Sequence, residues 1–112
     1  AKEIFYHGLV LGLCALFSDS YSITSNRESG EGRYDIQLTP RRPGQPGILI
    51  ELKAAKNCTG EALRELSRTA LRQIEGNLYD TQLRSQGVST VFKYGVAFCG
   101  KKVSIATANT TE

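Results

Sequence analysis

The feature that most constrains the fold is the segment Ile48-Leu49-Ile50-Glu51-Leu52-Lys53, in which consecutive apolar residues lead into alternating charged and apolar ones. A strand with apolar residues on both faces is typical of the centre of a sheet that is covered on both sides. Side chains two residues apart on a strand share a face, so Glu51 and Lys53 point the same way. Burying a carboxylate and an amine at the end of such a strand costs free energy unless the two groups are paired or bound to a metal.

The periodicity of the remaining chain predicts one domain with helices and strands on either side of this segment. The first helix places Phe5, Leu9 and Leu13 on its apolar face, and Tyr6, Val10 and Leu11 broaden that face. The predicted helices span 2–17 and 61–79. The predicted strands span 21–27, 33–39, 48–53, 91–99 and 103–106. Segments 28–32, 40–47, 54–60 and 80–89 are predicted connections, and 109–112 is a predicted frayed tail. The order α-β-β-β-α-β-β indicates an α/β fold.

Asp35 lies on the polar side of the alternating strand 33–39. If this strand pairs with 48–53, the carboxylate of Asp35 reaches that of Glu51. Two close carboxylates repel each other, and a divalent cation relieves the repulsion. Such a cation polarises a phosphoryl oxygen and activates a water, which a nearby lysine orients or deprotonates. The competing interpretation is that these are solvated edge charges or surface ion pairs, because strands also carry charges for structural reasons.

Composition sets wider limits on the protein. The 112 residues are 40% hydrophobic and 22% charged, which is typical of a globular domain. The formal net charge of +3 is compatible with a polyanionic partner without requiring one. The three cysteines lie far apart and favour a reducing compartment over a disulfide framework. The longest apolar stretch, 9–17, is shorter than the roughly 20 residues of a membrane span. Because the chain starts at Ala1, without a methionine, it suggests a piece of a longer protein.

Several motifs together resemble a known family. These are the pattern Asp35, Glu51 and Lys53, the stretch 25–35 (SNRESGEGRYD), and the segments 6–9 (YHGL), 70–74 (ALRQI) and 94–98 (YGVAF). In this order they resemble the PD-(D/E)XK nuclease superfamily, and in particular the branch found at the C-terminal end of many bacterial AAA-ATPase-like proteins. The resemblance covers about residues 3 to 103. One departure is that Tyr34, rather than proline, precedes the aspartate.

The resemblance implies a restriction-endonuclease-like αβββαβ core, with a mixed central sheet flanked by helices. It also implies metal-dependent cleavage of phosphodiester bonds, usually in DNA. On this interpretation Asp35 and Glu51 bind Mg²⁺ or Mn²⁺, the backbone carbonyl of Leu52 adds a ligand, and Lys53 serves the attacking water.

Other residues have weaker support. By resemblance, Glu3 on the first helix would bind the metal through water or steady the site, although an i,i+4 pair with His7 explains it equally well. His7 itself is either a metal ligand or a hydrogen-bonded helix histidine. Gln73 on the second helix would hold the phosphate or the lysine, with Tyr79 following it. Arg27 and Arg33 flank the hairpin turn and would clamp backbone phosphates.

Three functions remain open at this point. The first is a DNA nuclease that uses Mg²⁺ or Mn²⁺, alone or as a homodimer. The second is an RNase, for example a tRNA-cleaving toxin domain, and the third is a nucleic-acid-binding module that keeps the fold without turnover. No membrane is expected. The setting would be the bacterial cytoplasm, with fusion to an ATPase, or the cytoplasm of a target cell, with fusion to a larger toxin.

Overall fold

The computed structural model describes the backbone of residues 2–28, 33–75 and 79–111, and the side chains of 4–25, 35–75 and 80–109. Its helices are α1 (Lys2–Cys14), the 3-10 helix η1 (Ala15–Phe17), α2 (Gly60–Glu75) and α3 (Tyr79–Ser85). Its strands are β1 (Tyr21–Glu28), β2 (Arg33–Pro40), β3 (Gly47–Ala55), β4 (Thr90–Cys99) and β5 (Lys102–Thr111). The predicted turn at 28–32 lies mostly outside the described residues.

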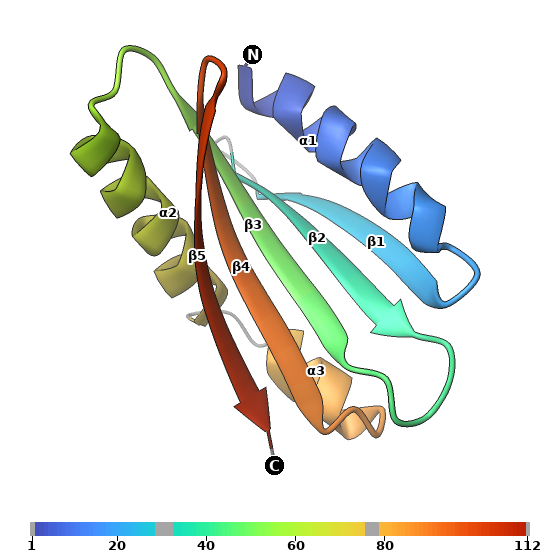
Figure 1. Cartoon of the computed structure of the whole chain (residues 1–112). Helices are drawn as coiled ribbons and strands as arrows, with labels where there is room; N and C mark the ends of the chain where they lie inside the picture. The colour runs from blue at the N-terminus through green and yellow to red at the C-terminus, as the bar shows by residue number, and fades with distance from the viewer. Residues whose placement is uncertain (1, 29–32, 76–78, 112) are drawn as a thin grey trace.

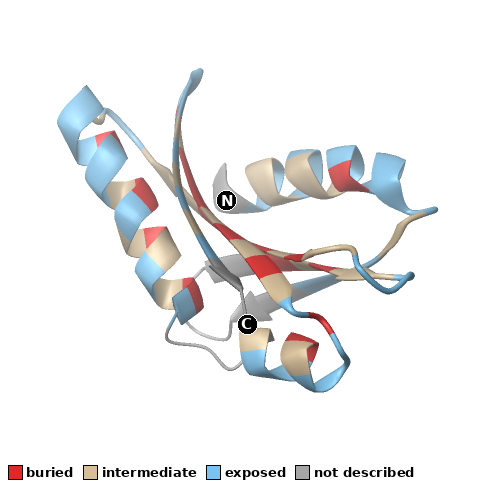
Figure 2. Ribbon diagram, turned by 60° about the horizontal axis from the view of Figure 1, so that its bottom comes forward, coloured by how far each residue is buried: buried red, intermediate tan, exposed pale blue. Residues whose placement is uncertain are grey.

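The strands form one mixed sheet in the order β1-β2-β3-β4-β5 (Figure 1). Only β3 and β4 pair in parallel, and the other neighbours are antiparallel. A parallel pair needs a long crossover connection, and α2 and α3 lie in that connection. As the apolar run predicts, β3 lies at the centre, with α1 on one face of the sheet and α2 and α3 on the other (Figures 1 and 2). The predicted α/β fold is confirmed.

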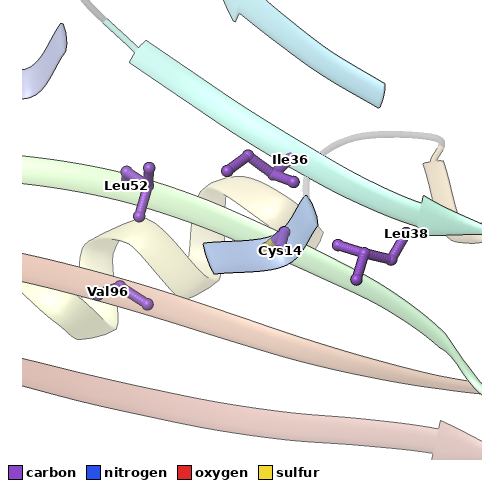
Figure 3. Packing of buried hydrophobic residues seen from close by; sticks show 5 residues of the cluster. All are labelled: Cys14, Ile36, Leu38, Leu52 and Val96. Carbon is purple, nitrogen blue, oxygen red and sulfur yellow. The ribbon is translucent and has the colours of Figure 1, made fainter. Parts of the chain in front are cut away.

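The core on the α1 side consists of side chains that alternate with polar ones along the strands. Its buried members are Cys14, Ile36, Leu38, Leu52 and Val96 (Figure 3). Val10 and Leu11 of α1 pack against them. The first turns of α1 contact the C-terminal end of β4. There Tyr6 stacks on Phe98 with the ring centroids 4.3 Å apart, and its hydroxyl donates to the carbonyl of Gly100 at 2.8 Å.

The predicted apolar face of the first helix is correct only in part, because Tyr6, Val10 and Leu11 pack on the sheet and the other three residues do not. Phe5, Leu9 and Leu13 are all about half exposed or more, whereas Val10, Leu11 and Cys14 face the sheet. The reason is that α1 carries apolar residues on nearly all sides, so periodicity alone does not select the side that packs. Among the described residues, no helix is long and apolar enough to cross a membrane.

On the opposite face, α2 buries one stripe of side chains against the sheet: Leu63, Ser67, Ala70 and Ile74. Thr59 caps this helix, because its hydroxyl accepts a hydrogen bond from the backbone nitrogen of Ala62 at 3.1 Å. The outer face of α2 is charged, and Arg64, Arg68 and Arg72 form exposed ion pairs with Glu61 and Glu65.

Two predictions, for the connections and for the tail, were wrong. The segment predicted as a polar connection forms α3, which is anchored by the fully buried Leu83. One apolar side chain gives no periodicity, so this short helix leaves little trace in the sequence. The last strand is also longer than predicted. It pairs with β4 from Lys102 to Thr111 and so includes residues 109–111 of the predicted frayed tail. α2 is described up to Glu75, and the predicted continuation through 76–78 lies outside the described residues.

Candidate active site

The pairing of β2 with β3 places Asp35 directly opposite Glu51. Directly opposed residues of an antiparallel pair lie on one face of the sheet, with Cβ atoms about 4.5–5.5 Å apart. Asp35 is only 4% exposed and Glu51 is fully buried. The structure therefore brings together the two carboxylates that the strand pattern pointed to, on the face that α2 covers.

Lys53 follows two residues after Glu51 on β3 and shares its face. It is half-buried, and its partner on β4 is Ala97. Leu52, between the two charged residues, points its side chain into the core on the α1 side. Only the backbone of Leu52 is therefore left to take part in the site, and its role as a carbonyl ligand stays a prediction.

The partner of Glu51 on β4 is Gly95. A Cβ atom at this position would overlap the backbone of Ser67 and of Leu71 on α2. Because no side chain separates them, the middle of α2 rests directly on β4 beside Glu51. The glycine thus sets how closely the helix approaches the carboxylates.

Gln73 lies further along α2, on the turn that follows this contact. Its side chain is half-buried, and its Oε1 atom is buried without a hydrogen-bond donor among the described residues. An unsatisfied buried amide oxygen costs about 1–3 kcal/mol, so folded proteins usually pair such a group with a water, an ion or a ligand. Gln73 therefore remains a candidate for contact with a ligand.

The structure adds a charged pair that the sequence pattern did not reveal. Lys93 of β4 is 4% exposed, and its Nζ atom lies 3.4 Å from Oδ2 of Asp80 in the first turn of α3. The partner of Lys93 on β3 is Leu49, two residues before Glu51, so Lys93 lies on the same face as the carboxylates. The signal in the sequence was a lysine inside an otherwise apolar strand.

His7 lies on the other side of the sheet. Its Nε2 atom hydrogen-bonds with the hydroxyl of Ser25, which pairs with Ile36 on the α1 face. Burial lowers the pKa of His7 below its usual value. The structure thus supports the hydrogen-bonded helix histidine and not a ligand beside Asp35 and Glu51. The side chains of Glu3, Arg27, Arg33 and Tyr79 lie outside the described residues, and their roles stay predictions.

The donor set decides which metal would fit. Within the described side chains, no group of three or more histidine, cysteine, aspartate or glutamate residues gathers in one place. A structural zinc site requires four such ligands, whereas Mg²⁺ is commonly held by one or two carboxylates and several waters. The pair of Asp35 and Glu51 therefore fits Mg²⁺ or Mn²⁺.

Comparison with known families gives an independent result. The sequence matches the PD-(D/E)XK nuclease superfamily over residues 1–108. The chain belongs to the PD-(D/E)XK nuclease superfamily. No curated protein matches it. PD-(D/E)XK nucleases typically depend on a divalent metal, which agrees with the donor set above, and the mixed sheet packed between helices is consistent with their fold. The narrower resemblance to the AAA-ATPase-associated branch stays a prediction.

Proposed function

We propose that this PD-(D/E)XK domain is a metal-dependent nuclease that hydrolyses phosphodiester bonds, with DNA as the preferred substrate. The observation that carries the proposal is the direct opposition of Asp35 and Glu51 on neighbouring strands, with Lys53 on the same face. Membership of the superfamily supports the same reaction class.

In this proposal, the carboxylates of Asp35 and Glu51 would hold Mg²⁺ or Mn²⁺, and the Leu52 carbonyl would contribute from the same strand. When bound, such a metal polarises a phosphoryl oxygen and lowers the pKa of a coordinated water. Lys53 would orient the attacking water or take up its proton. Gln73, whose Oε1 atom is buried without a donor among the described residues, would hold the phosphate or the lysine in place.

The surroundings of the site suggest where the nucleic acid lies. On the face that carries Asp35, strands β1 and β2 also present polar side chains, and Ser22 and Thr24 on this face are exposed. α2 instead packs over β3, β4 and β5. The polar surface of β1 and β2 would therefore receive the substrate backbone, and Arg33, two residues before Asp35 on β2, would contact its phosphates. Arg27 pairs with Tyr34 and alternates with the positions of that surface, so it is not assigned to it.

The arginines of α2 are weaker candidates for phosphate contacts. Arg64, Arg68 and Arg72 already donate to Glu61 and Glu65 at 2.9–3.0 Å. A phosphate would have to compete with these carboxylates. The outer face of α2 is therefore not assigned to the substrate.

A cleavage assay on supercoiled plasmid, linear duplex DNA and tRNA, with Mg²⁺, with Mn²⁺ and with EDTA, tests the proposal. We expect DNA cleavage that requires the metal. We expect Asp35→Asn, Glu51→Gln and Lys53→Met each to lower the rate by at least as much as the loss of an outer-shell partner of a metal site, which is about 10–100-fold. Asp19→Asn and Lys101→Met are matched controls at exposed positions and should keep the wild-type rate.

Three results would change the conclusion. Cleavage of tRNA with DNA left intact would move the assignment to an RNase. Unchanged activity in both carboxylate variants would place the chemistry elsewhere. If calorimetry detects no binding of Mg²⁺ or Mn²⁺ and no substrate is cut, the domain is a non-catalytic nucleic-acid-binding module.

A further inference from the structure

Two of the three cysteines, distant in sequence, meet at the edge of the sheet where β3 and β4 end. Cys99 is the last residue of β4, and its partner Ala55 is the last residue of β3. Cys58 lies in the connection that leads from β3 to α2. Its backbone nitrogen donates a hydrogen bond to Sγ of Cys99 at 3.1 Å, although 41 positions separate them in the chain. Both residues are thiols in this structure.

Local structure on both sides holds Cys58 over Cys99. Asn57 has a φ of 56°, in the left-handed region that asparagine tolerates better than most residues, and it turns the chain back toward the sheet. Immediately after Cys58, Thr59 caps α2. Cys99 is fixed from the other side by the pairing of β4 with β3 and β5. The approach of the two residues is therefore built into regular structure and does not depend on a loose loop.

A disulfide needs Cα atoms about 4.4–6.8 Å apart and Cβ atoms about 3.5–4.5 Å apart. The nitrogen of Cys58 lies within hydrogen-bonding distance of the Cys99 sulfur, so the Cα of Cys58 is only one bond further away. An approach this close is compatible with a disulfide between the two side chains. Cys14 is not a candidate partner in this disulfide, because it is buried in the core on the α1 face of the sheet.

The pair is also reachable from solvent. A cavity of about 300 Å³ opens beside it and is lined by both cysteines together with Lys56 and Lys102. Cys58 is half-buried and Cys99 is buried, so Cys58 is the sulfur that a reagent meets first. Burial, then the hydrogen bond and charge of Cys99, raise the pKa of the Cys58 thiol, and Lys102 opposes this rise.

We propose that Cys58 and Cys99 form a reversible disulfide, for which a small-molecule disulfide of the glutathione type is the oxidant. The thiolate of Cys58 attacks one sulfur of that disulfide, forms a mixed disulfide and releases one small thiol. The thiolate of Cys99 then attacks the sulfur of Cys58, closes the internal disulfide and releases the second small thiol. In total two protein thiols are oxidised and one small disulfide is reduced to two thiols.

The bond would tie the start of α2 to the end of β4. The loop it closes contains α2 and α3, the connection between the two parallel strands. A cross-link of this length restricts the unfolded chain and stabilises the folded one. It also lies close to the candidate active site, because Ala97, two residues before Cys99, is the partner of Lys53. The proposal itself rests on the thiol geometry and holds whether or not the domain is a nuclease.

The test incubates the whole chain with oxidised glutathione, unfolds it in urea so that the buried Cys14 becomes accessible, blocks the remaining thiols with iodoacetamide, and maps the digest by mass spectrometry without reduction. We expect a cross-linked peptide that joins Cys58 to Cys99, alkylation of Cys14 alone, and a higher unfolding temperature that dithiothreitol reverses. Cys14→Ala should give the same cross-link. Cys58→Ser should form no cross-link and should show no rise in unfolding temperature on oxidation.

Other outcomes would overturn the proposal. A stable glutathione adduct on Cys58 without closure would show that Cys99 does not reach it. A cross-link to Cys14, or three alkylated cysteines after oxidation, would also refute the pairing. The readouts are the map of thiols and the unfolding temperature, and neither depends on nuclease activity. Failure of the disulfide and failure of the proposed nuclease function are therefore distinguishable.

Discussion

Gly95 stands opposite Glu51 across the parallel pair of β4 and β3, at the place where α2 rests on the sheet. A side chain on β4 at this point would separate the helix from the strand. The glycine instead lets the backbone of Ser67 and Leu71 contact β4 directly, so that Glu51 is enclosed between helix and sheet. The position of α2, and with it that of Gln73, depends on this single residue.

Gly95→Ala should therefore destabilise the fold and displace α2. The added methyl group meets backbone atoms, which cannot rotate away, and overpacking typically costs about 1–3 kcal/mol, so the loss should lie at the upper end of this range. Urea unfolding measures the decrease in the free energy of unfolding. Gly12→Ala is the matched control, because no atom of the described residues lies within 4 Å of a Cβ at that helical position, and it should raise stability by up to about 1 kcal/mol. Equal stability of the Gly95→Ala variant and the wild type would contradict the close contact.

The two opposed carboxylates should make stability depend on divalent metal. A ligand that binds only the folded state adds about 2.7 kcal/mol when its concentration is 100 times its Kd. Addition of MgCl₂ or MnCl₂ should therefore raise the unfolding temperature of the wild type, and Glu51→Gln should abolish the rise. Asp19→Asn, at an exposed position, should retain it. A metal-dependent rise of the same size in Glu51→Gln would remove this glutamate from the site.

Much of the sheet could be predicted because its strands carry a clear pattern. Ile36 and Leu38 alternate with Asp35, and this period of two assigns each residue to a face. The apolar run before Glu51 marks the central strand, because consecutive apolar residues put apolar side chains on both faces. The two carboxylates could therefore be placed on one face once β2 and β3 were assumed to be neighbours.

The remaining features depend on tertiary contacts that leave no local pattern. The side of α1 that packs was not predictable, because Val10 and Leu9 are equally apolar and only the sheet distinguishes them. The register that sets Gly95 against Glu51 is a property of two strands far apart in the chain. Lys93 is buried because Asp80 comes to it from α3, a helix whose single buried leucine gave no periodicity.

Removal of Lys93 and removal of Asp80 should lower the free energy of unfolding by unequal amounts. The side chain of Lys93 is 5% exposed and that of Asp80 is 27% exposed. Asp80→Asn leaves a buried ammonium without the carboxylate 3.4 Å away, which costs about 3–5 kcal/mol. Lys93→Met leaves a carboxylate that water still reaches, so its cost should be smaller, about 1–2 kcal/mol.

Urea unfolding of both single variants and of the double variant checks this order. The double variant should be more stable than Asp80→Asn alone, because the buried charge has been removed together with its partner. If Lys93→Met were the more damaging change, the lysine would be contributing chiefly through packing of its aliphatic stem.

His7 should give the stability of the fold a pH dependence near neutrality. Burial lowers its pKa in the folded protein below the 6.5 of the unfolded chain. Between these two pKa values the unfolded state binds more protons, so the free energy of unfolding rises with pH there. The contribution is complete above the unfolded pKa and is lost as the pH falls through 6.5 toward the folded value. A single proton limits the slope to about 1.4 kcal/mol per pH unit.

His7→Gln keeps a polar group near Ser25 but does not titrate, so it should flatten this part of the profile. Unfolding by urea at closely spaced pH values measures the slope. Glu61→Gln is the control, because hydrogen bonding and the charge of Arg64 lower the pKa of Glu61, and its contribution is lost only as the pH falls below 4.5. An unchanged slope in His7→Gln would assign the pH dependence to another group, whereas a flattened one ties it to the contact between α1 and β1.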